Sequence, residues 1–561
     1  MYKNKILKIC LVIFIFLVSY NNLLSSDNNF NTNQKNLQNN IEARILSIND
    51  FHGQIMEGLI VSGRPAGSAA VLAAYLRQAL SKNPESTIIV HVGDHIGGSI
   101  PESALLQDEP SIEFFNMLTN SFCTYASRYD EYCNVLATVG NHEFDEGQDE
   151  LNRIIFGGNH KKGPFLENPY QGAKFGYISS NIIKEDGETI LKPYAIKIVS
   201  GVKIGFIGAI LKNMETMVSA SGIKGLKFLD EADSINKYVM ELKKEGIKAI
   251  VVLIHQGGQQ DKDGTFSGPI FNIVKSLNSE VDIVLSGHSH THINTLVKNR
   301  QNKDILLTQA YSNGTAYADI QIMLDRISGD IVKKEASIVT TFADEGAGLK
   351  PEQDIKDLTL AAANKTAPIV NEIIGSTKVD ITRTQNNAGE SALGDLITDA
   401  QRQTMKTDFS FMNPGGIRAD IKAGNITYGA LYSVQPFGNN LIKMYLTGDQ
   451  IYTLLTQQWT DESYPRMLQI SGLTYLWDST LPLTKRVIEI QNIDGSPIDR
   501  AKTYAVTVNS FLADGGDNFT ILKEGKNREI GAVDLDALIN YIRKQSLDSY
   551  YIIQNRIKRI D

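Results

Sequence analysis

Cysteine is scarce in this sequence, which limits the kinds of metal site and cross-link that the chain can form. Only three cysteines occur among 561 residues, and Cys10 lies inside an N-terminal apolar run. The other two, Cys123 and Cys133, are expected to form a disulfide in an oxidising compartment, and two free thiols are the alternative. A structural zinc site closed by thiolates is therefore not expected.

The sequence also lacks an excess of positive charge. Its 55 lysines and arginines are outnumbered by 63 aspartates and glutamates, so the formal net charge is −8. Proteins that bind nucleic-acid polymers usually present a basic face. We therefore expect no nucleic-acid polymer as a partner. A small anionic substrate is not excluded, because a few metal ions and arginines can set the local field.

The apolar run near the N-terminus is too short to cross a bilayer. Three lysines within the first eight residues precede apolar residues 9–18, whereas a membrane span needs about 18–20 residues. We expect residues 1–26 to be a signal peptide, or an uncleaved anchor as the alternative, and the protein to be exported to the periplasm or outside the cell. Contact with a membrane is expected only if this segment stays uncleaved. Residues 27–41 are predicted to be a disordered spacer.

The length of the chain indicates at least two large domains. Short β-branched runs alternate with longer mixed segments over residues 42–345, which predicts a layered α/β domain. Residues 346–374 are predicted to be a linker helix, because apolar residues recur there at helical spacing. After this segment the sequence contains more turn-forming and glycine-rich stretches, and residues 375–561 are predicted to form a second α+β domain.

Five apolar runs in the first domain each lead directly to residues that can bind a divalent metal. The runs cover residues 44–48, 87–92, 135–139, 249–254 and 281–285. The candidate ligands are Asp50, His52, Asp94, Asn141, His255, His288 and His290. In open α/β sheets, ligands bind beyond the carboxyl ends of the strands, so these side chains are expected to meet in one cluster. Nearby glycines let the backbone turn sharply and approach closely.

The chemistry of this set predicts a pair of metal ions. Imidazoles, carboxylates and an amide oxygen suit Zn, Mn, Co or Fe. One tetrahedral ion cannot use all seven groups, whereas two ions that share Asp94 can, and two ions about 3.5–4 Å apart suit phosphoryl transfer. Taken singly, each motif could instead reflect an ordinary turn or a histidine buried in the core. Five of the nine histidines lie in these motifs, however, and His95 and His292 are expected beside the site.

The motifs resemble those of the calcineurin-like metallophosphoesterases. Segments 49–53 (NDFHG), 140–145 (GNHEFD) and 287–292 (GHSHTH) are more narrowly similar to the 5′-nucleotidase family, which includes bacterial periplasmic nucleotidases, UDP-sugar hydrolases and 2′,3′-cyclic phosphodiesterases. The resemblance covers nearly all of the chain from residue 42 onwards. It implies a four-layer αββα metallophosphoesterase domain followed by a substrate-binding domain.

The resemblance also implies roles for individual residues. One metal would be held by Asp50, His52, Asp94 and His290, and the other by Asp94, Asn141, His255 and His288. His142 and Asp145 would form a catalytic dyad. An imidazolium there would stabilise charge on the phosphate oxygens or protonate the leaving group. Asp145 would fix the tautomer of the ring, and a helix N-cap is the alternative for this aspartate.

By the same resemblance, the second domain would select the substrate. Its predicted substrate-binding residues are Arg383, Asn413, Gly415, Arg418, Phe437, Asn439, Phe511 and Asp517. The arginines would bind phosphate or ribose, the two phenylalanines would stack on the nucleobase, and Asp517 would accept from a ribose hydroxyl. Without the resemblance, both phenylalanines would be assigned to the core.

These inferences predict an exported dinuclear-metal phosphohydrolase, a monomer or weak dimer, that acts on small nucleotides. Nucleoside 5′-monophosphates are the expected substrates, with 2′,3′-cyclic nucleotides or UDP-sugars as further ones. One alternative is a sulfur-ester hydrolase on the same scaffold, which would not need the two phenylalanines. A second is a catalytically silent nucleotide-binding surface protein, which the complete ligand set disfavours. Because the substrate would bridge two domains, a hinge is expected near residues 345–375.

Overall fold

The computed structural model describes residues 40–261, 263–461, 465–547, 550 and 552–561. The predicted signal peptide or anchor at residues 1–26 lies outside the described residues. So does the predicted spacer at residues 27–41, except for its last two residues, which begin the first strand. Within the described ranges, every helix is too short or too polar to span a bilayer.

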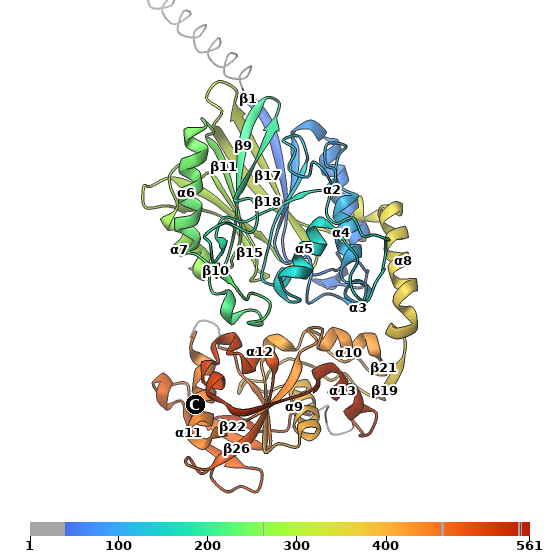
Figure 1. Cartoon of the computed structure of the whole chain (residues 1–561), viewed down its shortest axis with the longest axis vertical. Helices are drawn as coiled ribbons and strands as arrows, with labels where there is room; N and C mark the ends of the chain where they lie inside the picture. The colour runs from blue at the N-terminus through green and yellow to red at the C-terminus, as the bar shows by residue number, and fades with distance from the viewer. Residues whose placement is uncertain (1–39, 262, 462–464, 548–549, 551) are drawn as a thin grey trace, which may run out of the picture.

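Two six-stranded sheets form the centre of the first domain (Figure 1). The first sheet has the order β18 (Ile331–Thr340), β17 (Ala316–Asp325), β1 (Asn40–Ile48), β4 (Thr87–Val92), β5 (Val135–Thr138) and β6 (Gly176–Ile178). The second has the order β15 (His292–Lys298), β16 (Asp304–Ala310), β14 (Ile283–Ser286), β11 (Ala249–His255), β9 (Val202–Ile210) and β8 (Tyr194–Val199). Strands β1, β4 and β5 run parallel, and so do β9, β11 and β14.

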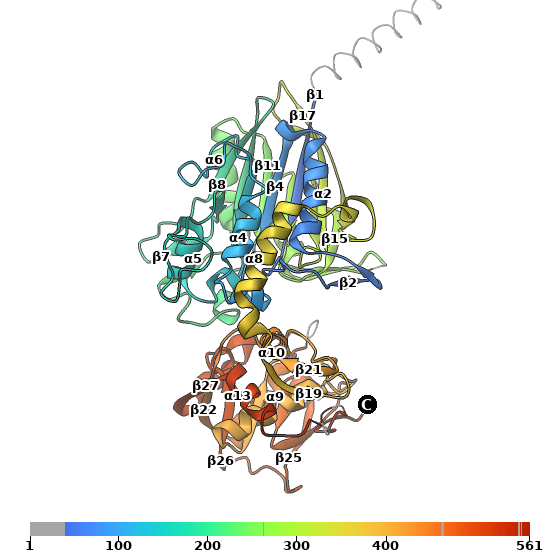
Figure 2. The ribbon, with the colours of Figure 1, turned by 90° about the vertical axis from the view of Figure 1, so that its right-hand side faces the viewer.

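The sheets pack face to face, with helices on both outer faces. Apolar residues from both sheets, such as Ile45 and Val90 from one and Phe206 and Val251 from the other, share one buried cluster. Helices α2 (Ala69–Ser81) and α4 (Glu109–Asn116) cover the first sheet, and α6 (Glu231–Lys244) and α7 (Pro269–Ser276) cover the second (Figures 1 and 2). Because both faces of each sheet are covered, every residue of β4 and β11 is buried. The four-layer αββα architecture is confirmed.

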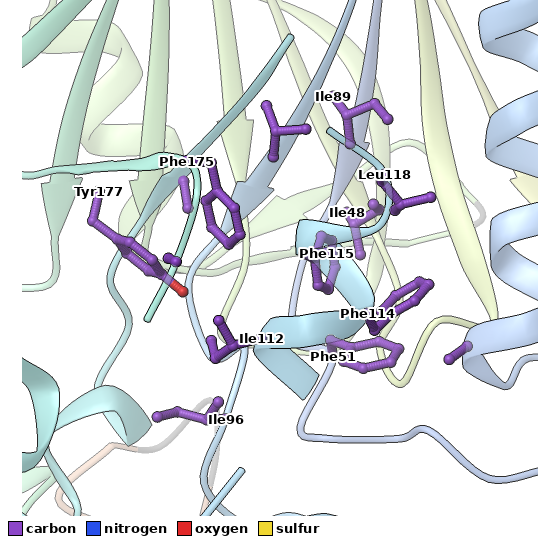
Figure 3. Packing of buried hydrophobic residues seen from close by; sticks show 14 of the residues in the cluster. Ile48, Phe51, Ile89, Ile96, Ile112, Phe114, Phe115, Leu118, Phe175 and Tyr177 are labelled. Atoms are coloured by element: carbon purple, nitrogen blue, oxygen red, sulfur yellow. The ribbon is translucent and has the colours of Figure 1, made fainter. Parts of the chain in front are cut away.

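An aromatic cluster fixes the loop that follows β1. Figure 3 shows Phe51 beside Phe114 and Phe115, which α4 supplies. The Phe51 ring stacks on Phe114 at a centroid distance of 5.2 Å and meets Phe115 edge-on at 5.6 Å. Phe51 lies between two candidate ligands, Asp50 and His52, so the packing of its ring determines where they point. Replacing such a core ring with alanine typically costs about 3–5 kcal/mol.

Helix α8 (Gln353–Val370) lies within the segment predicted to be a linker helix. Figure 2 shows it running along the first domain and on to the second. Ile355 and Ala362 bury their side chains in the first-domain core, so this part of the helix is anchored to that domain. The next strand, β19 (Ile373–Thr377), belongs to the second domain.

The second domain contains a mixed five-stranded sheet, which confirms the α+β prediction. Its order is β23 (Gln469–Ser471), β20 (Phe409–Met412), β26 (Thr503–Asn509), β22 (Asn440–Thr447) and β27 (Lys526–Val533). Strands β20 and β26 are parallel, and β22 is antiparallel to β26. The loops after β20 and β26 and before β22 therefore meet at one edge of the sheet. Figure 1 places α10 (Tyr428–Val434) and α12 (Ser510–Ala513) on the side facing the first domain.

The expected disulfide is present. Cys123 and Cys133 are bonded, with their Cα atoms 4.6 Å apart. Both side chains are buried in the first-domain core, and neither belongs to the candidate ligand set. The bridge closes the short loop between α4 and β5.

A pH-dependent loss of stability is expected from Asp534, the first residue of α13 (Asp534–Ile542). Burial raises the pKa of this carboxyl to about 7. Between pH 4 and 7 the unfolded chain loses this proton while the folded chain keeps it, so stability falls as pH rises, by at most about 1.4 kcal/mol per pH unit. Asp534→Asn keeps the neutral form at every pH. Its stability relative to the natural chain should grow from pH 4 to 7 and then level off in denaturant titrations. A constant difference would contradict this assignment.

Candidate active site

The five predicted strand ends converge where the two sheets meet. In the first sheet, the loops after β1 and β4 are joined by backbone hydrogen bonds from Asp50 to Gly93 (3.1 Å) and from His52 to Asp94 (3.0 Å). The second sheet connects to the first through His255, at the end of β11, whose Nδ1 lies 2.8 Å from the carbonyl oxygen of Val92. Side chains that are far apart in sequence therefore meet in one place.

One group of candidate ligands surrounds Asp94, Asn141, His255 and His288. Nε2 of His255 lies 3.1 Å from Oδ2 of Asp94 and 3.2 Å from Oδ1 of Asn141. The same amide oxygen lies 3.0 Å from Nδ1 of His288. This group is the one that the resemblance implied for the second metal.

A second group surrounds Asp50, His52 and His290. Nε2 of His52 lies 3.0 Å from Nε2 of His290, which lies 3.4 Å from Oδ1 of Asp50. Oδ2 of Asp94 is 3.9 Å from Nε2 of His52. Since that oxygen also approaches His255, Asp94 lies between the groups. The structure thus brings together all seven predicted ligands, with Asp94 in the shared position.

The orientation of the rings fits a metal site. His52 and His255 each direct Nδ1 at a backbone carbonyl, that of Gly97 (2.8 Å) and that of Val92 respectively. A ring that donates Nδ1–H to a carbonyl keeps the lone pair on Nε2, the arrangement typical of histidine ligands. Nitrogen and oxygen lone pairs therefore face one another, and divalent cations between them would satisfy this donor set.

The backbone of the site is strained. Five of the seven candidates have positive φ angles: Asp50 (51°), His52 (50°), Asp94 (52°), His288 (77°) and His290 (56°). Few residues other than glycine adopt this conformation, and it persists where the surrounding structure enforces it, often at functional sites. Glycines supply the remaining room, since a Cβ atom on Gly93 would lie 2.6 Å from the His255 ring, and one on Gly140 would lie 2.3 Å from Asp94.

Burial and charge set the protonation of the candidate ligands. Burial lowers the pKa of His288 to about 3 and that of His52 well below its usual value, so both rings are neutral and able to bind a metal. Burial also acts to lower the pKa of His255, but the carboxylates of Asp94 and Asp50 and the carbonyl of Val92 together outweigh it and raise the value to about 10. A metal ion at this position would displace that proton.

The predicted dyad is assembled at the same place. Nδ1 of His142 lies 2.7 Å from Oδ2 of Asp145, and the backbone N–H of His142 donates to Oδ1 of Asp94 at 2.9 Å. Burial acts to lower the pKa of His142, but the carboxylates of Asp145 and Asp94 outweigh it and raise the value. The side chain of Asp145 therefore contacts the ring instead of capping a helix. Nε2 remains the ring atom that could act on a substrate.

Sequence reasoning missed a residue that organises the site, Glu143. Its buried carboxylate accepts the backbone N–H groups of Asp94 (2.9 Å) and His95 (2.7 Å), and also that of Gly140. It thereby joins the loop after β4 to the loop after β5. The signal was its place inside the segment 140–145.

His95 does lie beside the site, where its ring stacks on His91 at 3.9 Å and bonds to the hydroxyl of Tyr177.

Three of the predicted substrate residues meet in the second domain. Nδ2 of Asn413 donates to Oδ2 of Asp517 at 2.8 Å, and its Oδ1 accepts from Nδ2 of Asn509 at 3.0 Å. A Cβ atom on Gly415 would lie 3.6 Å from the Asn413 amide and 3.8 Å from the Asp517 carboxylate. Arg466, which the sequence did not single out, approaches Oδ1 of Asp517 at 3.3 Å.

The aromatic loops are placed differently from each other. Asn439 accepts a hydrogen bond from Oγ of Ser510 at 2.9 Å, which connects the loop carrying Phe437 to helix α12, which carries Phe511. The Phe511 ring packs closely on Gly516, where a Cβ atom would lie 2.5 Å from it. Phe437 instead reaches the first domain, where its ring lies 5.5 Å from that of His142.

The two predicted arginines also differ. The guanidinium carbon of Arg418 lies 5.7 Å from the centre of the Phe437 ring. Burial lowers the pKa of Arg418, while Asp94, Asp145 and Asp50 act to raise it, which places this guanidinium in the field of the metal site. Arg383 is exposed and donates from Nη1 to the carbonyl of Ile417 at 3.0 Å, one residue before Arg418.

Comparison with known proteins gives two adjacent matches to family models. Residues 43–292 match the calcineurin-like phosphoesterase model, and residues 373–524 match the 5′-nucleotidase C-terminal domain model. The chain is 37% identical to Endonuclease YhcR of Bacillus subtilis over 93% of its own length, but it spans only 41% of that protein. It is 34% identical to Cell wall protein Lmo0130 of Listeria monocytogenes, covering 90% of this chain and 67% of that one. A solved structure, a 5′-nucleotidase precursor from Thermus thermophilus, is similar with a TM-score of 0.75 and 27% identity over 93% of this chain and all of that one.

The dyad can be tested separately from the metal ligands. We expect His142→Ala to keep its metal content, since the backbone N–H that donates to Asp94 remains. Turnover of phosphate esters should fall by roughly 10²–10⁴-fold, the usual contribution of a proton-transfer group. Metal analysis of the purified variant and steady-state kinetics on an aryl phosphate give the two readouts. Normal turnover in a metal-loaded variant would remove His142 from the mechanism.

Proposed function

Because the chain belongs to the 5′-nucleotidase family of metal-dependent phosphoester hydrolases, we propose that it releases phosphate from nucleoside 5′-monophosphates by means of two divalent metal ions. The observation that carries the proposal is the contact between the domains. Phe437 of the second domain lies beside His142 of the first, and the Arg418 guanidinium lies beside the Phe437 ring. Groups suited to a nucleobase and a phosphate therefore face the candidate metal ligands.

The chain's own residues supply the surroundings that phosphate-ester hydrolysis needs. When bound, divalent ions at this site neutralise charge on phosphate oxygens and activate water for attack on phosphorus. Asp94 would contribute to both ion sites. His142, held at Nδ1 by Asp145, presents Nε2 to stabilise the phosphate oxygens or to donate a proton to the leaving oxygen. Arg418 adds a fixed positive charge of the kind that matches phosphate geometry.

Recognition of the nucleoside is assigned to the second domain. Phe437 and Phe511 offer aromatic faces, and stacking of a base on an aromatic ring is worth about 1–3 kcal/mol whichever base it is. Asp517, held by Asn413 and Arg466, would accept hydrogen bonds from ribose hydroxyls. UDP-sugars also present a base and free ribose hydroxyls, whereas 2′,3′-cyclic nucleotides present a base with both hydroxyls esterified by phosphate. We propose both as further substrates.

Two observations support export. The disulfide between Cys123 and Cys133 is typical of proteins from oxidising compartments. One relative carries the name of a cell wall protein. We therefore propose a periplasmic or extracellular location. Whether residues 1–26 are a cleaved signal peptide or an uncleaved anchor stays a prediction from the sequence.

A substrate panel with metal reconstitution tests the proposal. Metal-stripped protein is resupplied with Zn, Mn, Co or Fe and assayed on AMP, 2′,3′-cyclic AMP, UDP-glucose, single-stranded DNA and a thiosulfate ester. We expect phosphate release from AMP that depends on the added metal, and no cleavage of DNA. Cleavage of DNA alone would favour a nuclease, as the name of one relative suggests. Activity on the thiosulfate ester alone would favour a sulfur-ester hydrolase. Nucleotide binding without metal or turnover would favour a catalytically silent binding protein.

The ribose contact predicts a selective defect. Asp517→Asn removes the negative charge while keeping the shape of the side chain. A hydrogen bond to a charged group contributes about 1.5–3 kcal/mol, so we expect kcat/KM for AMP to fall by roughly 10–100-fold. The same variant should lose much less on 2′,3′-dideoxy-AMP, which lacks both hydroxyls. Equal losses on the two nucleotides would show that Asp517 does not recognise ribose.

A further inference from the structure

The ring of Phe437 makes a contact that nucleobase stacking does not require. It lies nearly parallel to the imidazole of His142, with ring centroids 5.5 Å apart and an interplanar angle of 13°. The two residues belong to different domains, since Phe437 follows α10 in the second and His142 follows β5 in the first. Stacked aromatic contacts at this distance are attractive and depend on orientation.

The His142 ring is restrained on other sides as well. Asp145 bonds its Nδ1 at 2.7 Å. The ring of His52 meets it edge-on, with centroids 5.1 Å apart and an interplanar angle of 77°. Phe437 covers a face of the ring that these two contacts leave open to rotation and to solvent, and the His142 side chain is accordingly only 15% exposed.

Gly98 forms the floor beneath this ring pair. A Cβ atom on Gly98 would lie 3.4 Å from Cε1 of Phe437, 3.8 Å from Cε1 of His142 and 3.5 Å from Nδ1 of His52. These are ordinary van der Waals distances, so the Gly98 backbone faces all three rings across a gap of about one methyl group. Its positive φ of 56° suits glycine. The first domain therefore presents a seat for the Phe437 ring, formed by Gly98, His52 and His142.

We propose that Phe437 is a positioning residue for His142, in addition to any contact that it makes with a nucleobase. The inference rests on the proposed function for the role of His142 as the group that acts on the substrate. Docking of Phe437 on its seat fixes the plane of the imidazole, with Nδ1 on Asp145 and Nε2 toward the metal ligands. The second domain then contributes to the chemical step and not only to substrate binding.

Phe511 provides the contrast. Its ring packs on Gly516 and against the core of its own domain, so its replacement should affect nucleotide binding, seen as a higher KM for AMP. Phe437, which contacts the dyad, should affect kcat, and it should do so for a substrate that has no base. Glycerol 2-phosphate is the appropriate probe, because it has no ring that could itself stack on Phe437.

The test compares Phe437→Leu, Phe437→Tyr and the natural chain, all loaded with metal. We expect Phe437→Leu to lower kcat on saturating glycerol 2-phosphate by about 3–10-fold, in line with the strength of an aromatic contact. The KM for this substrate should change by less than twofold. Phe437→Tyr keeps the aromatic ring and should retain most of the kcat that the leucine variant loses.

Phe122→Leu is a matched control, because it removes an aromatic contact elsewhere, that with Tyr132 at 5.4 Å on the disulfide loop. It should leave kcat unchanged. An unchanged kcat in Phe437→Leu on glycerol 2-phosphate would overturn the inference, as would equal defects in the leucine and tyrosine variants. A higher KM for AMP with normal kcat in Phe437→Leu would sink the inference alone. Absence of AMP turnover in the natural chain would sink only the proposed substrate, because glycerol 2-phosphate still reports on His142.

Discussion

The site depends on the hydrogen bond between the His255 ring and the carbonyl of Val92, because this bond joins the two sheets where their strands end. Each sheet alone carries an incomplete ligand set. Asp50, His52, Asp94 and Asn141 follow strands of the first sheet, whereas His255, His288 and His290 lie at the ends of strands of the second. The apolar cluster between the sheets holds them together. The bond at His255 and the hydrogen bonds from the backbone N–H of His288 to the Asp50 carboxylate together fix how the two sets face each other.

A second constraint is the strain concentrated in the loops. Positive φ angles at five candidate ligands are unfavourable for the isolated chain and require compensation from neighbouring contacts. The compensation is visible in the stacked Phe51 ring and in the buried carboxylate of Glu143, which holds the N–H groups of two neighbouring loops. Packing and backbone hydrogen bonds thus enforce a geometry that the sequence would not adopt locally.

Much of the first domain follows from its sequence. Five apolar runs ending at metal-binding residues predict the strands and their common edge, because the carboxyl ends of parallel strands meet there. The role of Glu143 does not follow, since its place inside segment 140–145 draws attention to the residue but does not reveal that its carboxylate accepts backbone N–H groups. Nor does the sequence decide between a disulfide and two thiols, because two cysteines ten residues apart indicate proximity but not oxidation state.

In the second domain, Asn413, Gly415 and Asp517 do lie together as expected, and their roles stay predictions. Arg466 is missed because an isolated arginine carries no signal about its partner, and the contact of Phe437 with His142 joins separate domains, which no local pattern can encode.

Because the candidate metal ligands come from both sheets, binding of ions would also affect the stability of the first domain. Any ion that binds only the assembled pair of sheets stabilises it by mass action, in proportion to the logarithm of ion concentration over the dissociation constant. In the exported location that we propose, scarcity of the ions would therefore loosen the contact between the sheets. The lifetime of the protein would then depend on the same ions as its chemistry.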